Sequence, residues 1–258
     1  MSSHPNLIHM FNGIPFTTRS STDLLRSLDT FQAREDDLLL VSYPKSGTHW
    51  LANIIKNLYD SKVTLTSPLE FGDLSKLKEM NNLPSRRIIP THLSYNMLPH
   101  DLKEKKCKSI YIVRNPKDTA VSLYHYYRDN PNLPTIEAWP AYFNMFMQGE
   151  GCLEARVDQK RISKVRMTGL TVSLPKSIRK ICSFLGLSIS DQEINEVSRM
   201  SYFNEMKNNV EKENHDPNHT VCALTSNVTL IFRKAFIDPL VADAIEFMNI
   251  LPQWFPTF

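Results

Sequence analysis

Residues 36–60 read DDLLLVSYPKSGTHWLANIIKNLYD, and this stretch decides the fold. Residues 38–41 form a continuous apolar run, which is typical of a strand buried on both faces of a sheet. After the loop YPKSG, apolar side chains return at helical spacing, at Trp50, Leu51, Ile54, Ile55 and Leu58. The stretch therefore predicts a buried strand, a short loop and a helix.

A second unit of this kind lies at residues 108–129, KSIYIVRNPKDTAVSLYHYYRD. Residues 110–113 are apolar like a strand, and Pro116 suits a helix start because it lacks the amide hydrogen that would be unpaired there. Two strand–loop–helix units predict an α/β fold with a mostly parallel sheet flanked by helices. A length of 258 residues fits one large domain or two small ones, and we expect a single domain over 1–258.

Two further helices are predicted downstream. In SLPKSIRKICSFLGL, Pro175 stands near the start of a helix and Gly186 at its end. Ser190 and Glu193 then match a capping box, which predicts the start of another helix.

Composition limits the classes of function. The 30 basic and 27 acidic residues give a net charge of only +3, which argues against broad binding to nucleic acid or to a membrane surface. The sequence shows neither a signal peptide nor an apolar run of about 18 residues, so we expect a cytoplasmic protein. The cysteines are widely spaced without a C-x-x-C pair, which predicts reduced thiols rather than zinc ligands or disulfides (Cys107, Cys152, Cys182 and Cys222).

The loop between the first strand and helix suits an anion. A helix N-terminus presents unpaired amides and a positive dipole end, and Lys45 adds a charge, Gly47 allows close approach, and Ser46 and Thr48 offer hydroxyls. A capped turn with a surface lysine has the same composition. Because Lys45 precedes Gly47, the loop departs from G-x-x-x-x-G-K-[ST], and no G-x-G-x-x-G occurs. A nucleoside triphosphate or dinucleotide site is therefore disfavoured.

Three segments resemble the cytosolic sulfotransferases: YPKSGTHW at 43–50, PTHLSYNMLP at 90–99 and RNPKDTAVSLYHYYR at 114–128. The first and third begin about 70 residues apart. The resemblance implies a P-loop-like sulfotransferase fold. It also implies 3′-phosphoadenosine 5′-phosphosulfate (PAPS) as the sulfonate donor, 3′-phosphoadenosine 5′-phosphate (PAP) as the product, and no metal.

The resemblance also assigns the donor-binding residues. Trp50 matches an aromatic residue that packs on adenine, and Arg114 and Ser122 match residues that bind the 3′-phosphate. A guanidinium is well shaped for a phosphate because it donates two parallel hydrogen bonds. The loop that holds the 5′-phosphosulfate is matched by Lys45, Ser46, Gly47, Thr48 and His49.

His92 matches the catalytic base of the family. The attacking acceptor must lose a proton, and histidine titrates close enough to neutrality to take it. Lys45 is the second expected catalytic residue, because its charge would stabilise the negative charge that builds on the bridging phosphate oxygen.

Downstream matches are shorter. MSYFNEMKNN at 200–209 suggests adenine contacts from Ser201 and Phe203, although a capping serine and a core phenylalanine fit equally. Arg233 and Lys234 match a basic pair that grips the 3′-phosphate, and an exposed basic pair is the alternative.

The sequence departs from the family pattern in three places. Pro90 stands where relatives carry a lysine two residues before the base. Residues 151–172 lack the strand that ends in Tyr-Glu-Asp, so we expect a central strand and an adenine contact to be absent. Residues 235–258 diverge from the family's usual dimer segment, which leaves a homodimer open. We treat 151–172 and 235–258 as atypical.

These observations predict transfer of a sulfonate group from PAPS to a hydroxyl or amine of a small acceptor, such as a phenol, alcohol, sterol or amine. Neither nucleic acid nor membrane is an expected partner. Aromatic residues that could line the acceptor pocket, or equally the core, are Phe16, Tyr95, Tyr126 and Phe143. The alternatives are a catalytically silent nucleotide-binding relative, a variant product lacking part of the fold, and a small-molecule kinase of the P-loop superfamily.

Overall fold

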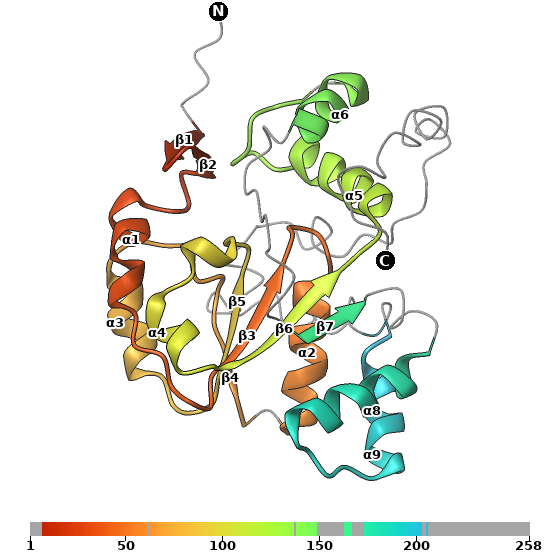
Figure 1. Ribbon diagram of the computed structural model, residues 1–258. Helices are drawn as coiled ribbons and strands as arrows, with labels where there is room; N and C mark the ends of the chain where they lie inside the picture. Colours follow the sequence, from red (N-terminus) through yellow and green to blue (C-terminus); the bar gives the residue numbers. More distant parts are fainter. Residues whose placement is uncertain are drawn as a thin grey trace, which may run out of the picture.

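The computed structural model describes residues 7–60, 62–136, 138–148, 163–166, 173–202 and 205. Within them, a parallel five-stranded sheet has the order β4-β5-β3-β6-β7, with helices on both faces (Figure 1). The strands are β3 (Leu38–Ser42), β4 (Thr64–Leu65), β5 (Arg87–Thr91), β6 (Lys108–Val113) and β7 (Ser163–Arg166). The prediction of an α/β fold with a mostly parallel sheet is confirmed.

Strand β3 lies at the centre of the sheet because its side chains are apolar on both faces. Leu38 and Leu40 pack in one core cluster with α2 (Thr48–Leu58), α8 (Leu174–Leu185) and α9 (Asp191–Met200). Leu39 and Val41 pack in the other cluster. Alternate residues of a strand point to opposite faces, so the continuous apolar run serves both cores. The predicted strand, loop and helix are confirmed.

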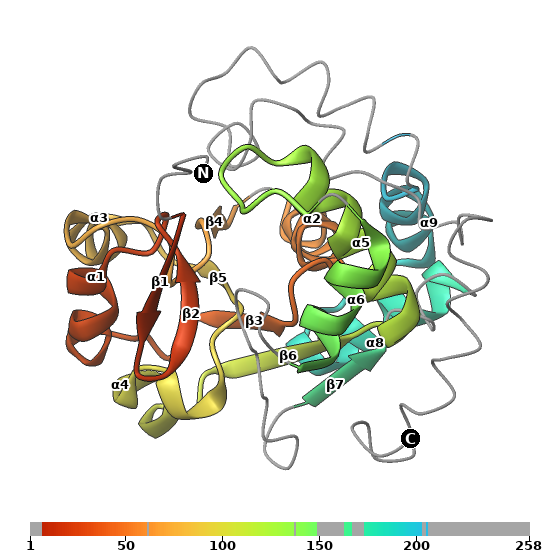
Figure 2. The same cartoon turned by 90° about the horizontal axis from the view of Figure 1, so that it is seen from above.

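The second face and the carboxyl end of the sheet carry the remaining elements. The elements are β1 (Ile8–Phe11), β2 (Ile14–Thr17), α1 (Thr22–Ser27), η1 (Leu28–Thr30), α3 (Ser75–Asn82), η2 (Tyr95–Met97), α4 (His100–Glu104), α5 (Pro116–Asp129) and α6 (Trp139–Gln148). The antiparallel hairpin of β1 and β2 lies with α5 and α6 beyond the carboxyl ends of the sheet strands, at the top of Figure 1 and toward the viewer in Figure 2. Pro116 is the first residue of α5, as the sequence predicts.

The β1–β2 hairpin turns at Asn12 and Gly13, whose φ angles are 51° and 76°. Two consecutive residues with positive φ form the tight turn that suits the twist of a two-stranded hairpin, and Asn-Gly is a favoured pair there. Phe16 of β2 is 1% exposed and belongs to the core. The hairpin is thus anchored to the main body of the protein.

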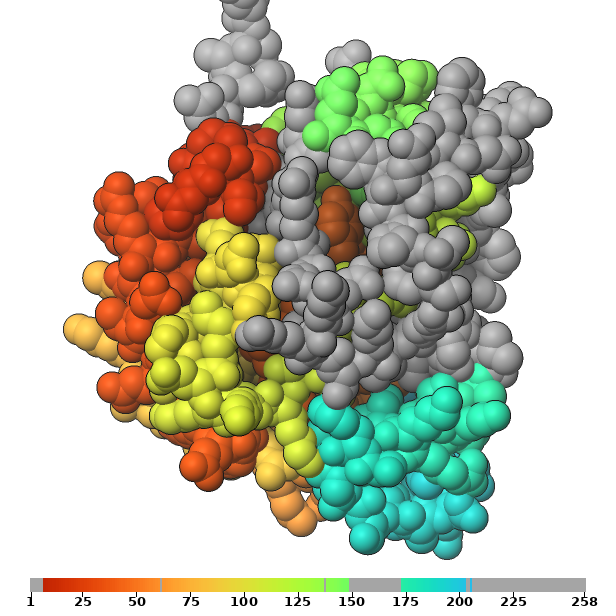
Figure 3. Space-filling model, in the orientation of Figure 1, coloured from red at the N-terminus to blue at the C-terminus, as the bar shows by residue number. Residues whose placement is uncertain are grey.

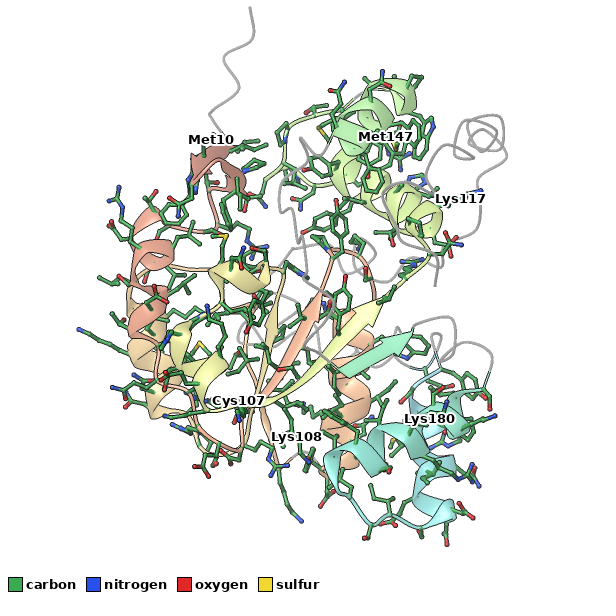
Figure 4. All side chains as sticks on the ribbon, viewed as in Figure 1. Met10, Cys107, Lys108, Lys117, Met147 and Lys180 are labelled. Carbon is green, nitrogen blue, oxygen red and sulfur yellow. The ribbon has the colours of Figure 1, made fainter. Side chains whose placement is uncertain are left out.

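Helices α8 and α9 pack against each other and form one block at the lower right of Figure 3. Gly186 ends α8 with φ 76°, and the Leu187 N–H donates to the Cys182 carbonyl at 2.9 Å. Lys108, at the amino end of β6 (Figure 4), donates to the Leu185 carbonyl at 2.9 Å. Ser190 and Glu193 form the capping box of α9. Both predicted helix boundaries are confirmed.

One prediction about the sheet is wrong. Residues 163–166, inside the segment expected to lack a strand, form β7 and pair with β6 in parallel. Ser163 pairs with Ile110, and Arg166 pairs with Val113. The edge of β6 that would have left unpaired backbone groups is therefore hydrogen-bonded.

An ion pair lies buried at the amino end of β5. The Arg87 and Asp37 side chains are 0% exposed, and the guanidinium donates to both carboxylate oxygens at 2.6 and 2.8 Å. Arg87 also donates to the Met80 and Gln32 carbonyls, each at 2.9 Å. The ion pair and these hydrogen bonds compensate for the free-energy cost of burying two charges in the protein interior.

Cys107 and Cys182 are buried free thiols, and burial is the main cause that raises the pKa of Cys107 to about 11. Cys152 and Cys222 lie outside the described residues. Among the described helices, none has the length and apolar character needed to cross a bilayer.

Candidate functional site

Three loops meet at the carboxyl ends of the neighbouring strands β5, β3 and β6. Val41 pairs with Thr91 and Ser42 pairs with Ile112, so the residues that follow these strands lie side by side. The register brings the predicted residues Lys45, His92 and Arg114 to one edge of the sheet. In open α/β sheets this edge is where ligands bind.

The loop before α2 has a tightly turned backbone. Lys45 has a φ of 65° and Gly47 a φ of 102°, and the Ser46 N–H donates to the Tyr43 carbonyl at 3.2 Å. A side chain is disfavoured at the Gly47 conformation, which explains the glycine. Because α2 begins at Thr48, the unpaired amides of its first turn face this loop.

Two cationic side chains meet at the loop. Arg114 donates from Nη1 to the Lys45 carbonyl at 2.7 Å, and the Lys45 Nζ lies 4.7 Å from the centre of the Tyr126 ring. Burial, and then repulsion from Arg114, lowers the pKa of Lys45 to about 7. Burial also lowers the pKa of Arg114. Cations held close together and away from water favour an anion between them, so these residues fit a phosphate or sulfonate group.

His92 is oriented by the end of β3. Its Nδ1 lies 2.9 Å from the Ser42 carbonyl oxygen, which can only accept, so Nδ1 carries the proton in this contact. In the neutral ring, Nε2 then holds the lone pair and can accept a proton. The Ser42 hydroxyl is 3.3 Å from Nδ1 and also pairs with the Thr48 hydroxyl. Ser42 therefore joins the His92 segment to the start of α2.

The indole of Trp50 is hydrogen-bonded to the residue that ends α9. Its Nε1 donates to the Ser201 carbonyl at 2.7 Å, and the Ser201 hydroxyl donates to the Val197 carbonyl at 2.6 Å. Ser201 is 1% exposed and caps α9, so its backbone orients Trp50. Ser122 is buried on α5, one turn after Asp118. Phe203, Arg233 and Lys234 lie outside the described residues.

His49 and Pro90 lie in one neighbourhood between α2 and the sheet, together with Thr48, Ala52, Leu65 and Thr66. The Pro90 carbonyl accepts from the Leu69 N–H at 2.8 Å, on the side of β5 that faces β4. The nitrogen of a strand residue points the same way as its carbonyl, and β4 has already ended at Leu65. Proline is tolerated because it interrupts no sheet hydrogen bond.

Sequence reasoning missed Glu70 and Arg19. The fully buried Glu70 carboxylate accepts from the His92 N–H at 3.0 Å. The Arg19 guanidinium lies 5.2 Å from the centre of the Phe71 ring, and that ring is 6.3 Å from the His92 ring. A buried acid inside the apolar run PLEF is the one sequence signal that could have indicated Glu70.

Residues 35–235 match the family described as "Sulfotransferase domain". Sulfotransferase 6B1 of Mus musculus is 36% identical to this chain over 216 residues, which cover 77% of this chain and 71% of the relative. The chain belongs to the cytosolic sulfotransferase family. Members of this family are enzymes that transfer sulfonate groups.

Other sulfotransferases agree with this assignment. Sulfotransferase 1A1 of Canis lupus familiaris is 32% identical over 231 residues, covering 81% of this chain and 78% of the relative. The crystal structure of mouse sulfotransferase SULT7A1 complexed with PAP superposes with a TM-score of 0.85 at 46% identity. That match covers 95% of this chain and 93% of the other. The predicted sulfotransferase fold is confirmed.

Proposed function

We propose that this sulfotransferase transfers the sulfonate group of PAPS to a hydroxyl or amine of a small acceptor. The observation that carries the proposal is the junction at Ser42. This residue contacts the proposed base, His92, and the start of α2, where the proposed anion site lies. A proton acceptor and an anion site beside each other are what sulfonate transfer to a hydroxyl needs.

The donor site is proposed from charge and from the comparison. Lys45, Arg114 and the first turn of α2 would hold the phosphates of PAPS, and Trp50 would pack on its adenine. Ser46, Thr48, His49 and Ser122 are further proposed contacts, as are Ser201, Phe203, Arg233 and Lys234. The PAP bound to the related SULT7A1 supports a nucleotide of this class.

In the proposed reaction, His92 accepts a proton and Lys45 stabilises negative charge. The donor supplies the sulfonate group and a phosphate that leaves with the electron pair of the broken S–O bond. His92 Nε2 takes the proton that the acceptor loses as its oxygen or nitrogen bonds to sulfur. Lys45 offsets the charge that develops on the leaving phosphate oxygen. Most of the rate enhancement would come from holding these groups in place.

The first test is thermal melting of the purified chain with increasing PAP. Binding to the native state alone raises stability, by about 2.7 kcal/mol at a ligand concentration of 100 Kd. We expect the melting midpoint to rise with PAP concentration, and 5′-AMP, which lacks the 3′-phosphate, to raise it less. A midpoint indifferent to PAP would refute the donor site. A shift without transfer to any phenol, alcohol, sterol or amine would favour the catalytically silent relative.

Lys45 predicts a pH dependence of PAP binding. Its pKa is about 7 in the free protein, so the side chain is mostly neutral at pH 8. A bound anion favours the ammonium form and raises that pKa, so binding takes up a proton. Because proton uptake weakens binding as the pH rises, we expect affinity to fall above pH 7 by up to about tenfold per pH unit.

Isothermal titration calorimetry in buffers of different ionisation enthalpy measures this proton uptake directly. The second phosphate ionisation, with a pKa of about 6, is nearly complete in this range and contributes little. Lys45→Met should abolish the uptake, and Lys56→Met, in the last turn of α2, should retain it. Equal proton uptake by wild type and Lys45→Met would contradict the assignment.

A further inference from the structure

The backbone of His92 is held by a buried carboxylate. Glu70 is 0% exposed, and its Oε1 accepts from the His92 N–H at 3.0 Å while its Oε2 accepts from the Thr91 hydroxyl at 2.9 Å. The Thr91 hydroxyl in turn accepts from the Leu93 N–H at 3.1 Å. The carboxylate thus fixes the chain before the His92 α-carbon directly, and the chain after it through the Thr91 hydroxyl.

The segment that carries Glu70 is itself held by a buried lysine. Lys76 of α3 is 7% exposed and donates to the Ser67 hydroxyl at 3.0 Å and to the Phe71 carbonyl at 2.7 Å. It also donates to the Pro68 carbonyl. The ammonium group therefore closes the loop on either side of Glu70, and its charge attracts the Glu70 carboxylate.

We propose that Glu70 is a positioning residue for His92, with Lys76 fixing the loop that presents it. This inference rests on the proposed function. The His92 backbone is anchored to Glu70 and its ring to the Ser42 carbonyl. Two anchors on opposite parts of one residue leave Nε2 little freedom to move, and catalytic groups need such support.

The test compares Glu70→Gln with wild type. Glutamine keeps the size and can still accept from the His92 N–H, but it removes the charge. The primary readout is hydrogen exchange of the His92 backbone amide by NMR, which needs no turnover. We expect this amide to exchange faster in the variant, because its acceptor has lost its charge. Glu79→Gln, an exposed acid on α3, is the matched control and should leave the exchange unchanged.

Kinetics provide the second readout. We expect kcat to fall about tenfold in Glu70→Gln and about 10- to 100-fold in Glu70→Ala, as a small misplacement of a catalytic group can cause. The KM for PAPS and the melting shift with PAP should remain close to wild type.

Unchanged exchange of the His92 amide together with an unchanged kcat in Glu70→Gln would overturn the proposal. A Glu70→Gln protein that loses cooperative melting or the PAP shift would also overturn it, because Glu70 would then support the fold as a whole. Failure of the proposed function is a separate result: wild type would transfer no sulfonate group, while the NMR comparison would still show whether Glu70 acts on His92.

Discussion

His92→Gln should lower the rate of sulfonate transfer by about 10²- to 10⁴-fold, the usual contribution of a general base. The His92 N–H bond to Glu70 comes from the backbone and does not depend on the side chain, so the loop should keep its conformation. Glutamine offers no group that takes a proton near neutral pH. The loss should therefore appear in kcat, while the melting shift with PAP is retained.

Single-turnover transfer from labelled PAPS measures this effect without interference from product release. The matched control is His100→Gln, an exposed histidine on α4 that pairs with Glu104 at 3.6 Å. It should behave like wild type. A His92→Gln enzyme with transfer within threefold of wild type would exclude His92 as the base.

The second large effect concerns the fold. Replacing Asp37 with alanine leaves the Arg87 charge buried without its carboxylate. Breaking a buried ion pair by removing one partner costs about 3–5 kcal/mol of unfolding free energy, a large share of a typical total of about 5–15 kcal/mol. The two remaining carbonyl acceptors of Arg87 cannot neutralise its charge. We expect a much lower urea midpoint.

Equilibrium urea unfolding at constant pH tests this expectation. Asp23→Ala, which removes the exposed pair with Arg26 at 3.9 Å, should leave the midpoint nearly unchanged because surface pairs contribute little. The double variant Asp37→Leu/Arg87→Met should recover much of the loss, since neither charge is then buried. An Asp37→Ala midpoint equal to that of Asp23→Ala would show that the pair is dispensable.

The parts of the fold that sequence could predict are those in which local pattern and tertiary environment agree. The run 38–41 is apolar because it is buried on both faces, and Pro116, Gly186 and Ser190 mark helix ends through local backbone chemistry. The segment 163–166, SKVR, has no such pattern. Its strand is defined by backbone pairing with β6, which side-chain periodicity does not report.

The residues of the candidate site likewise divide into those that local sequence motifs predict and those that only tertiary contacts reveal. Lys45, His92 and Arg114 lie in short motifs, and parallel strand register is enough to bring their loops together. Glu70 lies in no recognised motif, and its partner His92 is 22 residues away in the chain. The Asn12-Gly13 turn carried a hairpin signal that the sequence interpretation did not use. A residue that supports the site through a tertiary contact, as Glu70 does, can be identified only once the structure shows which residues it contacts.

The hydrogen bond from Trp50 to the Ser201 carbonyl spans 151 residues of chain. Contacts between residues so distant in sequence form slowly, because the intervening chain must first be brought together. During synthesis on the ribosome, the loop at 43–47 emerges long before α9, and the indole cannot take its final orientation until that helix docks. If Trp50 packs on the nucleotide as proposed, the proposed donor site would form among the last parts of the protein, and nascent chains would bind PAP weakly until α9 is in place.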